Sequence, residues 1–172
     1  LDKALAYARH YPAINWNTSY SEYLDDLAGW YGKNVGEDFI ACRTQIAQLL
    51  QEENKLMEIV KLIGADVLPD DQKLIIEIAR VIRTGFLQQN AYHQDDTFVP
   101  MEKQLKMMRI ILHLYKAAQG LVARAIPLSQ LTATGLFDEV SRIKYDVPND
   151  RLDLLDGYAD RIDDAMRRLG QQ

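Results

Sequence analysis

The spacing of apolar residues constrains the fold most, because it follows the 3.6-residue period of an α-helix along most of the chain. A long helix is predicted from about Asp38 to Ile63, where Gly64 ends it, and at 1.5 Å per residue it would be roughly 39 Å long. No segment shows the strict apolar–polar alternation that is typical of a strand. The sequence therefore predicts an all-α helical bundle. In the helix predicted from Asp38 to Ile63, the side chains expected to face the core are Phe39, Ile46, Leu49, Leu50, Leu56, Met57, Val60 and Ile63.

Start signals predict the other helices. The segment 19–22, Ser-Tyr-Ser-Glu, matches a capping box, in which a serine hydroxyl and a glutamate satisfy free amides at a helix start. A helix beginning at Pro69 is expected to end between Gly85 and Gln88, and a polar stretch separates it from a helix that begins at Pro100. Pro127 starts a shorter helix, and Pro148 precedes the last one. The first helix should carry one apolar face made of Tyr20, Tyr23, Leu24, Leu27, Trp30 and Tyr31.

Composition excludes several classes of protein. The chain has 172 residues, of which 48% are hydrophobic, and this is enough for one core without disulfides. A net charge of −5 with scattered lysines and arginines argues against a nucleic-acid partner. No apolar run approaches the ~20 residues that a membrane span requires, so no direct membrane insertion is expected. Cys42 lies among apolar residues and is expected to be a buried small hydrophobe, not a nucleophile.

The residues that usually carry chemistry do not cluster. His10, His93 and His113 lie far apart without partners at metal-ligand spacing, so no metal site is predicted. His113 falls in an apolar helix and is expected to be a hydrogen-bonded core imidazole. The chain contains no phosphate-binding loop of the form GxxxxGK[ST], which argues against phosphoryl transfer by this chain alone. The sequence predicts no catalytic residue.

Two aromatic stretches stand out. They are HYPAINW at 10–16 and FLQQNAY at 86–92, which Phe98 follows. Aromatic side chains around a polar amide cluster suit the binding of a planar ring, because the aromatics stack on its faces while amides read its edge. Composition alone favours a simpler interpretation, in which Phe86 and Tyr92 cap the bundle.

The order of these motifs carries a resemblance. DKALAYARHYPAINWNTSYSEYLDD, GADVLPDDQKLIIEIARVIRTGFLQQNAY and MMRIILHLYKAA closely resemble the carboxy-terminal part of the catalytic (alpha) subunit of V/A-type rotary ATPases, from Leu1 to about Tyr145. The resemblance implies that the chain is part of a larger subunit that couples ATP hydrolysis or synthesis to rotation and ion transport. Residues 1–18 would be the end of the nucleotide-binding domain and residues 19–172 the helical carboxy-terminal domain. The catalytic groups would lie upstream.

The resemblance also implies two functional sites. In the family an aromatic ring packs on the adenine of ATP at the position of Tyr11, and a second does so at the position of Tyr92. Phe98 matches a further aromatic of the pocket wall, and Gln89 and Asn90 flank the edge of the ring. The loop that corresponds to the family's lever segment, which touches the rotating central stalk, contains Asp66, Val67, Leu68, Pro69, Asp70 and Asp71.

Partners and ligands follow from the same resemblance. The complete subunit would bind ATP or ADP with Mg²⁺, alternate with the family's non-catalytic subunits in a hexamer, and lie on the cytoplasmic face of the membrane. The isolated chain is expected to hold no nucleotide tightly and to be inactive. The alternative is a free-standing helical module that binds a partner protein and has no nucleotide function.

Overall fold

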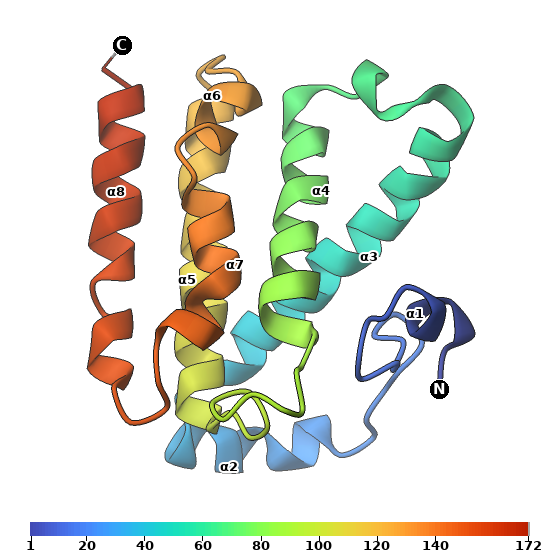
Figure 1. Cartoon of the computed structure of the whole chain (residues 1–172), viewed down its shortest axis with the longest axis vertical. Coiled ribbons are helices and arrows are strands. Elements are labelled where there is room, and N and C mark those ends of the chain that lie inside the picture. The colour runs from blue at the N-terminus through green and yellow to red at the C-terminus, as the bar shows by residue number, and fades with distance from the viewer. Residues whose placement is uncertain (172) are drawn as a thin grey trace.

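The computed structural model describes residues 1–171, and within this range the chain is all-α and contains no strand, as predicted. The body of the bundle consists of α3 (Phe39–Ile63), α4 (Asp70–Val81), α5 (Met101–Val122), α7 (Leu136–Asp146) and α8 (Tyr158–Leu169) (Figure 1). The shorter elements are α1 (Lys3–Tyr7), α2 (Leu24–Asn34), α6 (Leu128–Thr132), the 3-10 turns Ala65–Val67 and Leu152–Leu155, and the π-helix Ile82–Leu87.

The central element is α5, which contacts α3, α4, α7 and α8. Apolar residues are buried on more than one side of this helix, as is typical of a helix inside a core. Helical periodicity in the sequence predicts only one buried stripe here, because it assumes a single buried face, and that stripe consists of Leu105, Met108, Ile111, Leu112 and Tyr115. The buried apolar residues of α5 are Leu105, Met107, Met108, Ile110, Ile111, Leu114, Ala118 and Leu121.

The predicted boundaries of α3 and α4 agree closely with the structure. The first runs from Phe39 to Ile63, and its predicted core side chains are buried or half-buried, except that of Ile63, which is exposed. The second begins one residue later than predicted, because Pro69 is the N-cap residue. Pro100 and Pro127 likewise precede α5 and α6 as N-cap residues.

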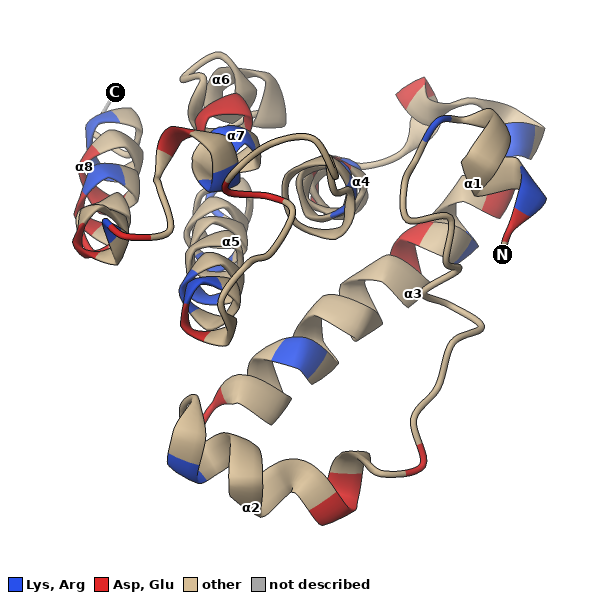
Figure 2. Ribbon diagram, turned by 60° about the horizontal axis from the view of Figure 1, so that its bottom comes forward, with Lys and Arg blue, Asp and Glu red and all other residues tan. Residues whose placement is uncertain are grey.

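The prediction for α2 was wrong in two respects. The helix begins at Leu24 with Tyr23 as its N-cap, and no side chain caps it, so the segment 19–22 forms no capping box. None of its residues is buried, and in Figure 1 it lies across one end of the bundle. Asp25 and Asp26 in its first turn and Lys33 in its last turn complement the helix dipole, and Figure 2 shows this separation of charge.

The last helix, α8, is amphipathic, as the helical spacing of its apolar residues predicts; these residues are Leu152, Leu155, Ala159, Ile162, Met166 and Leu169. Tyr158, Ile162 and Met166 are buried on the side that faces the bundle. Charged residues of both signs follow the rest of the helix, and Figure 2 shows them along its length. Its periodic apolar positions begin earlier, in the turn at Leu152–Leu155. One apolar stripe therefore fixes this segment against α5.

Residues 1–18 form a compact segment with its own polar contacts. The Asp2 carboxylate accepts hydrogen bonds from the backbone N–H of Leu5 (3.0 Å) and from Asn15 Nδ2 (2.9 Å). His10 is buried and packs edge-on against Trp16, with ring centroids 5.2 Å apart. The assignment of this segment to a separate nucleotide-binding domain stays a prediction.

A π-helix continues α4 and leads into the polar loop. Within it, Gly85 lies so close to α7 that a Cβ atom placed there would be 2.7 Å from Ser141 Cα and 2.8 Å from its carbonyl oxygen. Both atoms belong to the backbone, so they cannot move without shifting α7. Periodicity predicted the end of this helical segment correctly, but it did not predict that the last six residues form a π-helix.

Gly85→Ala is therefore expected to destabilise the chain by ~1–3 kcal/mol, the usual cost of overpacking. Urea-induced unfolding would measure the change in the free energy of unfolding. Gly120→Ala is the matched control, because a Cβ at this helical position would meet no atom within 4 Å apart from the neighbouring backbone of its own helix. That control should gain up to ~1 kcal/mol from helix propensity. Equal effects of the two substitutions would contradict the close approach at Ser141.

An ion pair between Asp38 and Arg109 links the start of α3 to α5. Arg109 Nε donates to Asp38 Oδ2 at 2.8 Å, and this hydrogen bond lowers the pKa of the Asp38 carboxyl from 3.8 to about 2. Because the folded-state pKa is depressed, the pair stabilises the fold above the unfolded pKa and is lost as the pH falls from 3.8 towards 2. Asp38→Asn should reduce the acid-induced loss of stability by less than ~1 kcal/mol, because both side chains are partly exposed. Urea unfolding at about pH 5 and about pH 2 would measure it, and an unchanged pH dependence would contradict the pairing.

None of the helices in residues 1–171 combines the length and the apolar character needed to cross a bilayer.

Candidate nucleotide-base site and tip of the bundle

The two aromatic stretches identified in the sequence meet in the structure. The backbone N–H of Gln89 donates to the carbonyl oxygen of Tyr11 at 2.7 Å, and Gln88 Nε2 donates to the carbonyl oxygen of Arg9 at 3.4 Å. These bonds join the amino-terminal segment to the loop that follows the π-helix. The joined segments line an open depression of about 500 Å³, formed by Tyr11, Gln88, Gln89, Asn90, Ala91, Tyr92 and Tyr145.

The tyrosine rings of this depression are exposed. The Tyr92 residue is 99% exposed and Tyr11 is 54% exposed, so neither ring is used by the core. Asn90 Oδ1 accepts a hydrogen bond from the backbone N–H of Tyr92 at 3.0 Å, which makes a local turn and sets the position of that tyrosine. Two aromatic rings beside polar amides can bind a flat heterocycle by stacking and edge hydrogen bonds.

Phe98 is not brought to this depression. Its side chain is exposed, and it is absent from the lining formed by the residues that the structure describes. Its backbone carbonyl accepts a hydrogen bond from Asn149 Nδ2 at 2.9 Å, which directs this part of the loop towards the segment after α7. The structure therefore unites Tyr11, Gln89, Asn90 and Tyr92, but not the fifth predicted residue.

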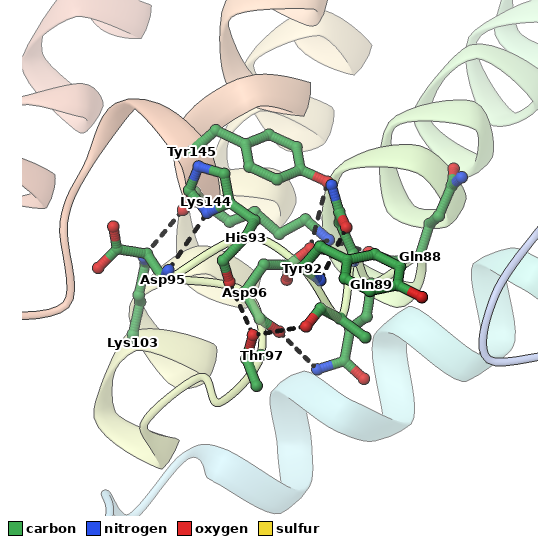
Figure 3. Close-up of polar contacts among 12 residues, drawn as sticks. Gln88, Gln89, Tyr92, His93, Asp95, Asp96, Thr97, Lys103, Lys144 and Tyr145 are labelled. Atoms are coloured by element: carbon green, nitrogen blue, oxygen red, sulfur yellow. Dashed lines mark hydrogen bonds and ion pairs between the residues drawn. The ribbon is translucent and has the colours of Figure 1, made fainter.

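Buried charged side chains join the loop to α7, and Figure 3 shows their contacts. Lys144 of α7 and Asp96 of the loop form an ion pair of 3.0 Å, and their side chains are 1% and 0% exposed. The hydroxyl of Tyr145 donates to the same carboxylate at 3.2 Å. Sequence reasoning missed these three residues, although one signal was available. Lys144 falls on the apolar stripe of α7, four residues after Val140, where a charge must be paired.

The electrostatic environment follows from burial. Loss of solvent lowers the pKa of Lys144, and the hydrogen bond and charge of Asp96 oppose that shift. Burial raises the pKa of the Tyr145 hydroxyl, and the nearby Asp96 charge adds to the effect. His10 has a pKa below its usual value because of burial, with smaller contributions from Arg83 and Lys144. These groups leave the depression itself lined by uncharged side chains.

The predicted stalk-contact loop forms a tip between α3 and α4, at the end of the bundle opposite the polar loop (Figure 1). Asp66, Val67, Pro69 and Asp71 are exposed there. Leu68 is only 5% exposed, so it belongs to the packing beneath the tip and not to its surface. The Asp70 carboxylate accepts a hydrogen bond from the backbone N–H of Leu128 at 2.8 Å and so caps α6.

Apolar side chains dominate the exposed end of α3 beside this tip. Leu62 is 85% exposed, and Ile63 and Val67 are also exposed. Sequence reasoning assigned Ile63 to the core, because helical periodicity does not tell where a helix projects beyond its neighbours. The tip therefore offers an apolar surface next to three aspartates, of which Asp70 is already engaged within the bundle.

Residues 1–171 contain no group of three histidine, cysteine, aspartate or glutamate side chains that could hold a metal ion. Cys42 is buried, as predicted, and burial together with the Asp38 charge raises the pKa of its thiol to about 11.

The prediction for His113 was partly wrong. Its Nε2 lies 2.7 Å from Asp163 Oδ1, but the side chain is 38% exposed and links α5 to α8 at the surface instead of within the core.

Comparison with known proteins identifies the family. The family model described as the C-terminal domain of V and A type ATP synthase matches residues 28–132. The chain is 49% identical over 172 residues to the V-type ATP synthase alpha chain 2 of Clostridium tetani, covering 100% of this chain and 29% of the relative. It is 50% identical over 169 residues to the V-type ATP synthase alpha chain of Halothermothrix orenii, covering 98% and 29%. It is 47% identical over 145 residues to an A-type ATP synthase subunit of Methanococcus vannielii, covering 84% and 25%.

The chain thus spans less than a third of the length of these relatives. The match to the family model includes α3, α4, the polar loop and α5, and the alignment with the Clostridium tetani protein also includes Tyr11. The chain belongs to the family of carboxy-terminal domains of V- and A-type ATP synthases.

Proposed function

We propose that this chain is the part of an ATP synthase catalytic subunit that closes the adenine pocket and transmits motion to a central stalk. The observation that carries the first role is the backbone hydrogen bond between Gln89 and Tyr11, which brings the two aromatic stretches into one depression. Tyr11 and Tyr92 would stack on the adenine, and Gln89 and Asn90 would read its edge. Phe98 is left out of the proposed contacts because its side chain lies outside the depression.

The residues present suit a nucleobase but not the rest of ATP. The depression is lined by uncharged side chains, and residues 1–171 hold no carboxylate cluster for Mg²⁺. The triphosphate and the metal ion would be bound by groups outside this chain. Those groups would supply the phosphoryl chemistry, while Tyr11 and Tyr92 orient the base and exclude water from its faces. The isolated chain would accordingly be inactive.

The second role rests on the shape of the bundle. The tip between α3 and α4 lies at the opposite end from the base-contacting loop, and a close-packed core joins them (Figure 1). Close packing transmits a displacement instead of absorbing it. The exposed side chains of Leu62 and Val67 would push on the stalk by steric contact, with Asp66 and Asp71 beside them. The complete subunit would bind ATP or ADP with Mg²⁺. It would alternate with non-catalytic subunits in a hexamer and lie peripherally on the cytoplasmic face of the membrane.

Photoaffinity labelling tests the proposed adenine pocket. The assembled ATPase would be irradiated with an adenine nucleotide that carries an azido group on the base, and labelled peptides would be mapped by mass spectrometry. We expect labels on Tyr11 and on Tyr92, with loss of both when unmodified ATP competes. Fragmentation of the labelled peptides would locate the modified residue, and Phe98 itself should stay unlabelled if the base sits in the depression. Labelling confined to peptides outside this chain would overturn the proposal.

A further inference from the structure

A contribution to the stability of the fold does not by itself explain why the ion pair between Lys144 and Asp96 is buried. Both side chains are almost completely buried, and removing two charges from water is unfavourable even when they attract each other. Lys144 Nζ also donates a hydrogen bond to the carbonyl oxygen of Gln88, the first residue of the base-contacting loop. The lysine therefore holds the loop at two points, the carbonyl of residue 88 and the carboxylate of residue 96.

The Asp96 carboxylate in turn holds the residues that line the depression. Its Oδ2 atom accepts a hydrogen bond from the backbone N–H of Asn90 at 2.6 Å. The backbone carbonyl of Asp96 accepts one from Gln89 Nε2 at 3.2 Å. Figure 3 shows how these contacts converge on the loop. Both residues assigned to the edge of the base are thus bonded to Asp96, Asn90 through its backbone N–H and Gln89 through its side-chain amide.

A second buried lysine, Lys103, holds the end of α7 and the segment that follows it. Lys103 Nζ of α5 donates to the carbonyl oxygens of Lys144 (3.0 Å) and Val147 (2.6 Å) and to Asn149 Oδ1 (2.9 Å). The backbone N–H of Asn149 donates to Asp95 Oδ1 at 2.9 Å. The end of α7, the segment after it and the loop are therefore tied to α5 as one unit.

We propose that Lys144 is a positioning residue for nucleotide binding, which acts through Asp96 to hold residues 88–92 in the conformation that faces Tyr11. The inference rests on the proposed function. Without the pair, Asn90 and Gln89 lose their common anchor, and the loop occupies the binding conformation for a smaller fraction of the time. Apparent affinity falls by the same factor as that fraction. Turnover is spared because the phosphoryl chemistry takes place elsewhere.

The test uses steady-state kinetics of the assembled ATPase that contains the complete catalytic chain. Asp96→Asn keeps the shape of the side chain and removes its charge, while the double variant Asp96→Asn with Lys144→Met removes both charges together. If the competent fraction falls to about a tenth, the KM for ATP rises ~10-fold and kcat stays within about twofold. The preference for ATP over GTP should fall as well, because the loop that carries Gln89 and Asn90 is no longer held in position. Lys144→Arg keeps the positive charge, so this variant should retain most of the affinity for ATP.

A matched control and a milder variant complete the test. Lys106 of α5 forms an ion pair with Asp156 at 2.7 Å, and its polar contacts are to Glu102, Leu152 and Asp156 and not to residues 88–99, so Lys106→Met should leave the KM unchanged. Tyr145→Phe removes only the hydroxyl that donates to Asp96, so it keeps the test usable if the charge variants fail to assemble. It should speed amide exchange at Asn90 in the assembled ATPase, measured by mass spectrometry. Unchanged exchange there would count against the proposed anchor.

The possible results separate the two proposals. If Tyr11→Ala raises the KM and the charge variants leave it within about twofold, the positioning role of Lys144 is overturned and the adenine pocket stands. If kcat falls while the KM is unchanged in the charge variants, the pair has only a structural role and the inference also fails. If Tyr11→Ala itself has no effect on the KM, the proposed adenine pocket is contradicted, and the positioning role that rests on it falls with it.

Discussion

Tyr92→Ala in the complete subunit is expected to raise the KM for ATP by about 5- to 150-fold, and Tyr11→Ala should do the same. Stacking of an aromatic side chain on a base is worth ~1–3 kcal/mol, and this range corresponds to those factors. The base is contacted similarly in the ground state and the transition state, so kcat should fall much less than the KM rises. Both tyrosines are available for such contact because they are exposed in the described chain.

Steady-state kinetics of the assembled ATPase would measure both constants. Tyr7→Ala is the control, since Tyr7 is equally an exposed tyrosine of the amino-terminal segment but does not line the depression. Phe98→Ala tests the part of the pocket that the structure does not bring together, and it should leave the KM within about twofold. A collapsed kcat with an unchanged KM for the Tyr11 and Tyr92 variants would count against contact with the base.

The second large effect concerns stability. Lys144→Met should lower the free energy of unfolding by ~3–5 kcal/mol, because the substitution leaves the Asp96 charge buried without its partner. It also removes the hydrogen bond to the carbonyl oxygen of Gln88. Urea-induced unfolding at neutral pH would measure the loss.

A double-mutant cycle isolates the ion pair from these other contacts. Adding Asp96→Asn to Lys144→Met should recover part of the loss, because no unpaired charge then remains in the core. Lys106→Met serves as the control for a surface pair and should cost less than ~1 kcal/mol, since Asp156 is exposed. A loss for Lys144→Met as small as that of the control would contradict the buried pair.

The long helices could be predicted from sequence because many residues in each follow the same period. The predicted start of α3 at Asp38 differs by one residue from the observed start at Phe39, and its end at Ile63 is the same. The apolar stripe of α8 was likewise correct. In both helices the stripe faces a neighbour, so periodicity and packing agree.

The failures arose where local signals competed with tertiary structure. The serines at 19 and 21 suggested a helix start, yet α2 begins only at Leu24, and its aromatic residues stay partly or fully exposed. A π-helix at Ile82–Leu87 gives no periodic signal of its own, because its six residues also fit an α-helix. The need for Gly85 became visible only when α7 was in place beside it.

The candidate site shows the same limit. Tyr11 and Tyr92 were identified through resemblance, and no pattern in the sequence placed them together across 80 intervening residues. Lys144 and Asp96 were missed, although a lysine on an apolar stripe demands a buried partner, because the identity of that partner depends on the fold. At the tip, Leu68 was predicted to be a contact residue, yet it packs inward while Leu62 of α3 points outward.

The central claim is that this chain forms one wall of an adenine pocket in a larger catalytic subunit. The most direct measurement is a structure of the assembled ATPase with bound nucleotide. Our account predicts that the adenine ring lies against Tyr11 and Tyr92 at ~3.5–4.0 Å, with the phosphates held by residues outside this chain. An adenine ring that makes no van der Waals contact with either tyrosine, or that is bound entirely by other parts of the protein, would contradict it.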